Sequence, residues 1–97
     1  MRILWSDNAE RDLDEIYDHI ARDVPFYAGQ FIDRLIEATD KLQEHPRMGR
    51  MVPEAGYRDD VRELIVQGYR IVYWIQTEDL IILTVVHGSR HLSIENL

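Results

Sequence analysis

The sequence predicts an α+β fold with the element order β-α-α-β-β-β, in which an N-terminal helical hairpin packs on one face of an antiparallel sheet. Three observations predict it. Apolar residues recur at helical spacing in residues 7–23 and again in residues 25–44, and three strand-like segments follow residue 60. A helical half followed by a strand-rich half is typical of helices segregated to one side of an antiparallel sheet. The length of 97 residues fits one domain, residues 1–97.

The first strand is predicted at Arg2–Trp5, and the first helix follows it directly. Ser6 and Asp7 offer an N-cap, with Glu10 three residues after Asp7 in the arrangement of a capping box. Five residues at helical spacing form the stripe that is expected to be buried: Ala9, Leu13, Ile16, Tyr17 and Ile20. Four acids fall outside this stripe and are expected to be solvated: Asp12, Asp14, Glu15 and Asp18.

The second helix begins after the break Asp23-Val24-Pro25, because proline is tolerated in the first turn of a helix. Its apolar residues again form one stripe, and the helix is expected to end near Glu44, before Pro46. Two amphipathic helices joined by so short a break make a helical hairpin.

Three further strands complete the sheet. Residues 45–60 contain two prolines and two glycines without a clear period, which predicts a connecting loop. Strands are expected at Val61–Val66, Tyr69–Gln76 and Leu80–His87, with turns at residues 67–68 and 77–79. In the middle one, Tyr69, Ile71, Tyr73 and Ile75 share one face, and Arg70, Val72 and Trp74 share the other. The last strand is apolar on both faces, as expected of a central strand.

Composition excludes several classes of function. The chain has no cysteine, so it forms neither a disulfide nor a thiolate metal site. Its four histidines lack the spacing of paired metal ligands, and its glycines are too isolated for a phosphate-binding loop, so we expect no metal and no cofactor. The N-terminus does not resemble a signal peptide and no segment approaches a membrane span, so the cytoplasm is the expected location.

Charge also limits the partners. The net charge of −7 opposes non-specific binding to nucleic acid. Residues 7–23 hold seven acids against two bases, whereas residues 45–76 hold five arginines against four acids. The basic residues are ten Arg and one Lys, and Arg favours planar contacts with carboxylate or phosphate. An arginine-rich genome explains the same bias equally well.

An ordered set of motifs runs through the chain from Trp5 to Leu92: WSDNAERDLDEIYDHIA, LQEHPRMGRMVPE, VRELIVQGYRIVYWI and ILTVVHGSRHL. This set resembles the RelE/ParE superfamily of toxins from bacterial type II toxin–antitoxin systems. The resemblance implies a compact β-α-α-β-β-β fold, a cytoplasmic location and a cognate antitoxin as partner. An antitoxin segment of this kind is typically disordered alone and folds when it binds.

The superfamily contains two activities. RelE-like toxins cleave mRNA in the ribosomal A site without a metal, and in this chain that chemistry would fall to Arg62, Arg70, His87 and Arg90. Against it, Lys41 is the only lysine and lies in the second helix, and the final segment LSIENL has no tyrosine. ParE-like toxins poison DNA gyrase by binding, which needs no catalytic residues. The first helix, the HPxxGR loop and the VxHxxR ending favour the ParE-like branch, with a ParD-like antitoxin. A non-toxic interaction module is the remaining alternative.

Candidate binding residues follow from this hypothesis. Five residues of the last two strands and the segment after them are predicted to contact the target: Arg70, Trp74, His87, Arg90 and His91. For Arg70, an ion pair with an acid such as Glu63 is an equally weighted alternative. For the two histidines, a structural role is the favoured one.

Five apolar or aromatic residues of the N-terminal half are predicted to bind the antitoxin: Trp5, Leu13, Tyr17, Ile20 and Phe31. For Trp5, core packing is the favoured alternative. The acidic first helix predicts basic contacts from the antitoxin. The resulting assembly is a hetero-oligomer of toxin and antitoxin, with neither a membrane contact nor sequence-specific DNA binding by this chain.

Overall fold

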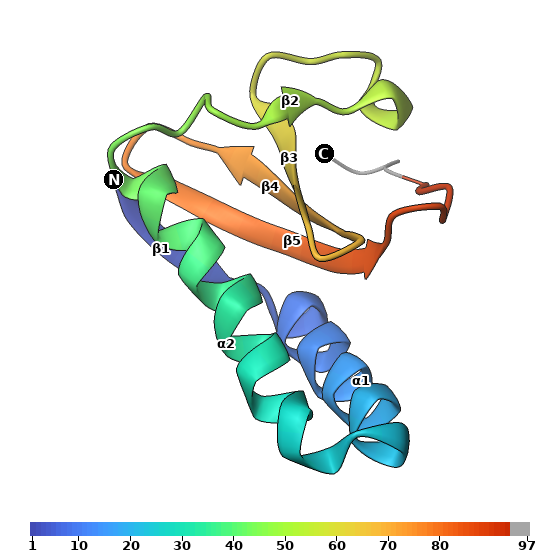
Figure 1. Ribbon diagram of the computed structural model, residues 1–97. Helices are drawn as coiled ribbons and strands as arrows, with labels where there is room; N and C mark the ends of the chain where they lie inside the picture. The colour runs from blue at the N-terminus through green and yellow to red at the C-terminus, as the bar shows by residue number, and fades with distance from the viewer. Residues whose placement is uncertain (94–97) are drawn as a thin grey trace.

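A computed structural model describes residues 1–93, which form one five-stranded sheet with a helical hairpin on one face (Figure 1). The α+β class and the predicted order of the main elements are confirmed. The elements are β1 (Arg2–Trp5), α1 (Asp7–Asp23), α2 (Pro25–Asp40), β2 (Arg50–Met51), β3 (Val61–Val66), β4 (Tyr69–Ile75) and β5 (Asp79–His87), with 3₁₀ turns η1 (Lys41–Gln43) and η2 (Pro53–Ala55).

The sheet is mixed rather than antiparallel. Its strand order is β1-β5-β4-β3-β2, and β1 pairs with β5 in parallel while the other three pairs are antiparallel. Parallel neighbours need a long connection, and here the helical hairpin and the three intervening strands provide it. Strand β5 therefore lies between β1 and β4, which confirms the central position predicted from its two apolar faces.

The segment 45–60 is more regular than the predicted loop. It contains η2 and the two-residue strand β2, which pairs with β3 through Arg50–Glu63 and Met51–Arg62. The hydroxyl of Tyr73 fixes the start of the segment, because it donates to the carbonyl of Pro46 at 2.7 Å and accepts from the amide of Gly49 at 3.0 Å. A two-residue strand is too short to show an alternating pattern in the sequence.

The helical hairpin follows the predicted signals with one correction. The hydroxyl of Ser6 caps α1 by accepting from the amide of Ala9 at 3.0 Å, so Ala9 occupies the position where a capping box needs Glu or Gln. The box predicted between Asp7 and Glu10 is therefore wrong. Val24 ends α1 and precedes Pro25, the first residue of α2. Within residues 1–93, neither helix is long and apolar enough to cross a membrane.

Apolar side chains pack on both faces of the sheet. The helix-side core joins the hairpin to the face of β4 that carries Ile71, Tyr73 and Ile75, as the sequence predicts. A smaller far-side core lies on the opposite face and consists of Val52, Val61, Val72, Val86 and Leu92. Residues of the 45–60 segment and of the segment after β5 thus cover the face that the hairpin leaves open.

Candidate functional site

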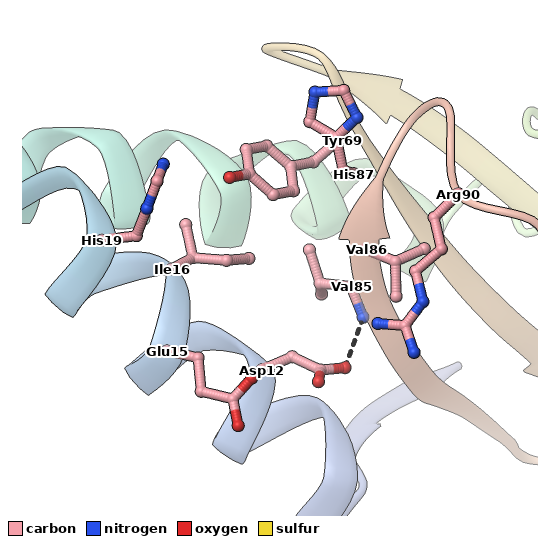
Figure 2. Close-up of a pocket in the computed structure, with 9 residues that line it drawn as sticks. All are labelled: Asp12, Glu15, Ile16, His19, Tyr69, Val85, Val86, His87 and Arg90. Atoms are coloured by element: carbon pink, nitrogen blue, oxygen red, sulfur yellow. Dashed lines mark hydrogen bonds between the residues drawn. The ribbon is translucent and has the colours of Figure 1, made fainter.

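An open cavity of about 160 Å³ lies where α1 meets the end of β5 (Figure 2). Charged and titratable side chains from four parts of the chain converge on it. The lining residues are Asp12, Glu15, Ile16 and His19 of α1, Tyr69 of β4, Val85, Val86 and His87 of β5, and Arg90 beyond β5. Two of the five predicted target-binding residues, His87 and Arg90, therefore share one site with the first helix.

Asp12 fixes one wall of this cavity. One of its carboxylate oxygens accepts hydrogen bonds from the amide of Val85 at 2.9 Å, from the hydroxyl of Thr84 and from the side-chain amide of Asn8 at 3.2 Å. The prediction that Asp12 is solvated is wrong. A signal in the sequence could have shown this, because Asp12 stands three residues after Ala9 and four before Ile16, on the face that those two buried residues define.

His87 and Arg90 offer accessible polar groups at the other wall. The His87 ring packs edge-to-face on Tyr69, with ring centroids 5.7 Å apart, and its Nδ1 lies 2.8 Å from the hydroxyl of Ser89. The amide of Arg90 donates to the carbonyl of His87 at 3.0 Å, which turns the chain back at the end of β5. Both side chains are exposed, and within residues 1–93 that of Arg90 forms no salt bridge. Within residues 1–93, both side chains are therefore accessible to a partner.

Arg70 occupies a different environment, on the opposite face of the sheet. It is 5% exposed and donates from Nε to Glu63 at 2.6 Å and from Nη1 and Nη2 to the two oxygens of Glu54 at 2.6 and 2.9 Å. These hydrogen bonds lower the pKa of Glu54 to about 2 and raise that of Arg70. The geometry favours the ion-pair alternative for Arg70, since little of its guanidinium is left for a direct target contact.

The remaining predicted target contacts also lie outside the cavity. Trp74 packs partly buried against the far-side core and donates from Nε1 to Asp60 at 3.1 Å. The side chain of His91 is 86% exposed, with Nδ1 3.9 Å from Glu54. The predicted set thus divides between two faces of the sheet.

The four residues of the ribonuclease alternative do not converge. Arg62 donates to the carboxylate of Asp59 at 2.6 Å and to the carbonyl of Gly49 at 2.9 Å, so its side chain holds the 45–60 segment. Arg62 and Glu63 are successive strand residues and point to opposite faces, which places Arg62 away from Arg70. Within residues 1–93, no group of His, Asp and Glu side chains has the arrangement of a metal site.

The predicted antitoxin contacts differ in accessibility. Phe31 is 8% exposed and packs edge-to-face on Tyr27 and Tyr69 in the helix-side core, with ring centroids 5.9 and 5.7 Å away. Three others also pack against that core: Trp5, Leu13 and Ile20. Tyr17 is 43% exposed and remains available. At the tip of the hairpin the sequence prediction missed Phe26, which is 98% exposed. Its position directly after Pro25, in the first turn of α2, was the available signal.

Comparisons with known proteins identify a family, a relative and a similar fold. Residues 3–92 match the family model described as ParE toxin of type II toxin–antitoxin system, parDE. The chain is 40% identical over 91 residues to "Putative toxin Y4kP" of Sinorhizobium fredii, covering 92% of this chain and 90% of that protein. A solved structure titled "Chromosomal ParDE TA system from P. aeruginosa" superposes with a TM-score of 0.76 at 24% identity, covering 90% of this chain and 95% of the other, which supports the fold.

Proposed function

The chain belongs to the ParE toxin family of type II toxin–antitoxin systems, and we propose that it acts by binding DNA gyrase and is neutralised by a cognate ParD-like antitoxin. The observation that carries the proposal is the cavity between α1 and β5, where the exposed His87 and Arg90 lie beside the acidic helix. Because gyrase and the antitoxin are both expected in the cytoplasm, the protein is proposed to act there.

A binding role suits these side chains better than a catalytic one. RNA cleavage without a metal would need a general base and several cations aimed at one phosphate. Here the side chains of Arg62 and Arg70 form hydrogen bonds within the protein, on opposite faces of the sheet. His87 and Arg90 remain as one hydrogen-bonding ring and one exposed cation, which together suit recognition of an acidic or polar protein surface.

The charge distribution supports α1 as the surface that binds the antitoxin. Residues 7–44 hold eleven acids against four bases, so the helical hairpin carries the net charge of −7. A basic antitoxin segment that folds on α1 would meet this charge and the exposed ring of Tyr17. Since Glu15 and His19 of the same helix line the cavity, a segment in that position would also cover its mouth. Neutralisation then follows from direct occlusion of His87 and Arg90.

Supercoiling by purified gyrase tests the proposed target. We expect the wild-type protein to inhibit supercoiling and to accumulate cleaved DNA, His87→Ala and Arg90→Ala to weaken both effects, and Arg2→Ala to leave them unchanged. Arg2 is a matched control because its side chain is exposed and pairs with Asp79 at the opposite end of β5. Unchanged supercoiling in the presence of excess wild-type protein would refute the proposed target.

A second experiment separates the two toxic activities in cells. Synthesis of DNA and of protein is followed by pulse-labelling just after this chain alone is induced. An early fall in DNA synthesis while translation continues supports gyrase as the target. An immediate fall in translation supports the ribosome instead, and no fall in either supports a non-toxic interaction module.

A further inference from the structure

The segment after β5 is held across the end of the sheet at three backbone positions. The amide of Gly88 donates to the carbonyl of Gly68 at 2.8 Å, in the turn between β3 and β4. The carbonyl of Arg90 accepts from Nη1 of Arg70 at 2.9 Å. The amide of Leu92 donates to the carboxylate of Glu54 at 3.1 Å. In two of these three contacts the backbone meets a side chain, Arg70 or Glu54, and these two side chains form an ion pair with each other.

The ion pair between Glu54 and Arg70 is buried. Glu54 of η2 and Arg70 of β4 expose 9% and 6% of their side chains, and the two planar groups meet through two parallel hydrogen bonds. Glu63, with a fully buried side chain, holds Nε of Arg70 at 2.6 Å and fixes the guanidinium from the other side. A buried ion pair contributes little net stability compared with well-packed apolar residues, but it fixes geometry because its hydrogen bonds are directional.

We propose that Glu54 and Arg70 are positioning residues for target binding, which hold the backbone of residues 90–92 so that the Arg90 side chain is presented at the α1–β5 cavity. This proposal rests on the proposed function, in which Arg90 contacts the target. The carbonyl of Arg90 accepts a hydrogen bond from Arg70, whereas its side chain lies next to Val86 and lines the cavity (Figure 2). Leu92, which is 9% exposed in the far-side core, fixes the other end of the segment.

The arginine of the GYRIVY motif thus acts through Arg90. Loss of the Glu54 carboxylate would remove one charged partner of Arg70 and the acceptor of the Leu92 amide together. The segment after β5 would then leave the sheet more often, and Arg90 would spend less time at the cavity.

The test combines hydrogen exchange with a double-mutant cycle on gyrase. Glu54→Gln has nearly the shape of the native residue, and Asp79→Asn is its matched control, because Asp79 also forms a two-point pair with an arginine, Arg2. We expect Glu54→Gln to raise exchange of the peptide 88–93 by about tenfold, whereas β4 and β5 should exchange faster only as far as the variant's lower free energy of unfolding requires. Gyrase inhibition should also fall by about tenfold. Asp79→Asn should change neither measurement.

The cycle with Arg90→Ala distinguishes positioning from plain stabilisation. If Glu54 acts through Arg90, Glu54→Gln added to Arg90→Ala lowers gyrase inhibition little further. Additive losses, unchanged inhibition by Glu54→Gln, or exchange of the sheet raised beyond what the variant's lower free energy of unfolding requires would each overturn the proposal. If the wild-type protein does not inhibit gyrase, gyrase is refuted as the target but the positioning role is still testable. The same double-mutant cycle is then measured with arrest of cell growth as the readout. Absence of both activities in the wild type would overturn the target-binding role of Arg90 and its positioning together.

Discussion

The carboxylate of Asp12 in α1 accepts a hydrogen bond from the backbone amide of Val85 in β5 at 2.9 Å. Strand β1 pairs with β5 only as far as Trp5–Ile82, so the next residues of β5 have no strand beside them on that side. The start of α1 replaces the missing strand, because Ser6 donates to the carbonyl of Leu83 at 2.9 Å and Asp12 accepts from Val85. A helix thereby satisfies backbone groups that a longer β1 would have paired.

Replacement of Asp12 should therefore destabilise the fold. Asp12→Ala leaves the amide of Val85 and the hydroxyl of Thr84 without their acceptor, and we expect a loss of about 1.5–3 kcal/mol in the free energy of unfolding. Asp14→Ala, at an exposed position two residues on, is the control and should change stability by no more than about 0.5 kcal/mol. Urea denaturation of the isolated toxin measures both. Equal values for the two variants would show that the Asp12 contacts contribute nothing.

The glycine of the HPRMGR segment is expected to tolerate no side chain. A Cβ at Gly49 would lie 2.5 Å from the hydroxyl of Tyr73 and 2.6 Å from the carbonyl of Glu63. Tyr73 is fully buried and Glu63 belongs to β3, so neither can move away at low cost. Gly49→Ala should lower stability by about 1–3 kcal/mol.

Gly29→Ala is the opposite control for this substitution. Gly29 lies in α2 with nothing within 4 Å of an added Cβ, so alanine should raise stability by about 0.5–1 kcal/mol through its helix propensity. Thermal unfolding followed by circular dichroism compares the two. A melting temperature unchanged by Gly49→Ala would contradict the close packing of the 45–60 segment on Tyr73.

The Glu54–Arg70 pair predicts a specific dependence on pH. Hydrogen bonds from Arg70 lower the pKa of Glu54 from 4.5 to about 2, so the folded state favours the ionised carboxylate. The resulting stability is fully present above pH 4.5 and is lost as the pH falls through about 2. The stability difference between wild type and Glu54→Gln should therefore shrink as the pH falls through this range. Denaturation curves at about pH 6, 4.5 and 3 measure it, and a constant difference would contradict the ion pair.

Periodicity predicts much of this fold because each face of a strand or helix must be either buried or exposed. The two faces of β4 follow their apolar pattern, and the break at Val24-Pro25 lies where the helices meet. The parallel pairing of β1 with β5 could not be predicted in this way, because a four-residue strand carries no information about the direction of its neighbour.

Side-chain hydrogen bonds explain why the site was only partly predictable. The sequence can single out His87 and Arg90, which line the cavity, because polar residues after an apolar strand are visible in it. The sequence does not single out Glu54, because its contacts depend on Arg70, 16 residues away, and on the returning segment at Leu92. Residues 94–97 of the predicted C-terminal tail lie outside the described part of the chain.

Tyr17 and Phe31 offer the sharpest test of the predicted antitoxin surface, since both are aromatic residues of the helical hairpin but differ in exposure. Phe31 is 8% exposed, so Phe31→Ala should cost about 3–5 kcal/mol of stability. Tyr17 is 43% exposed, and Tyr17→Ala should change stability by less than about 1 kcal/mol. Because Tyr17 is an aromatic residue at the proposed interface, Tyr17→Ala should instead weaken antitoxin binding by about tenfold. Calorimetric titration with the antitoxin measures this affinity. Because Tyr17→Ala stays folded, an unchanged affinity would place the antitoxin away from this part of α1, whereas a weaker affinity in a stable variant assigns Tyr17 to the interface.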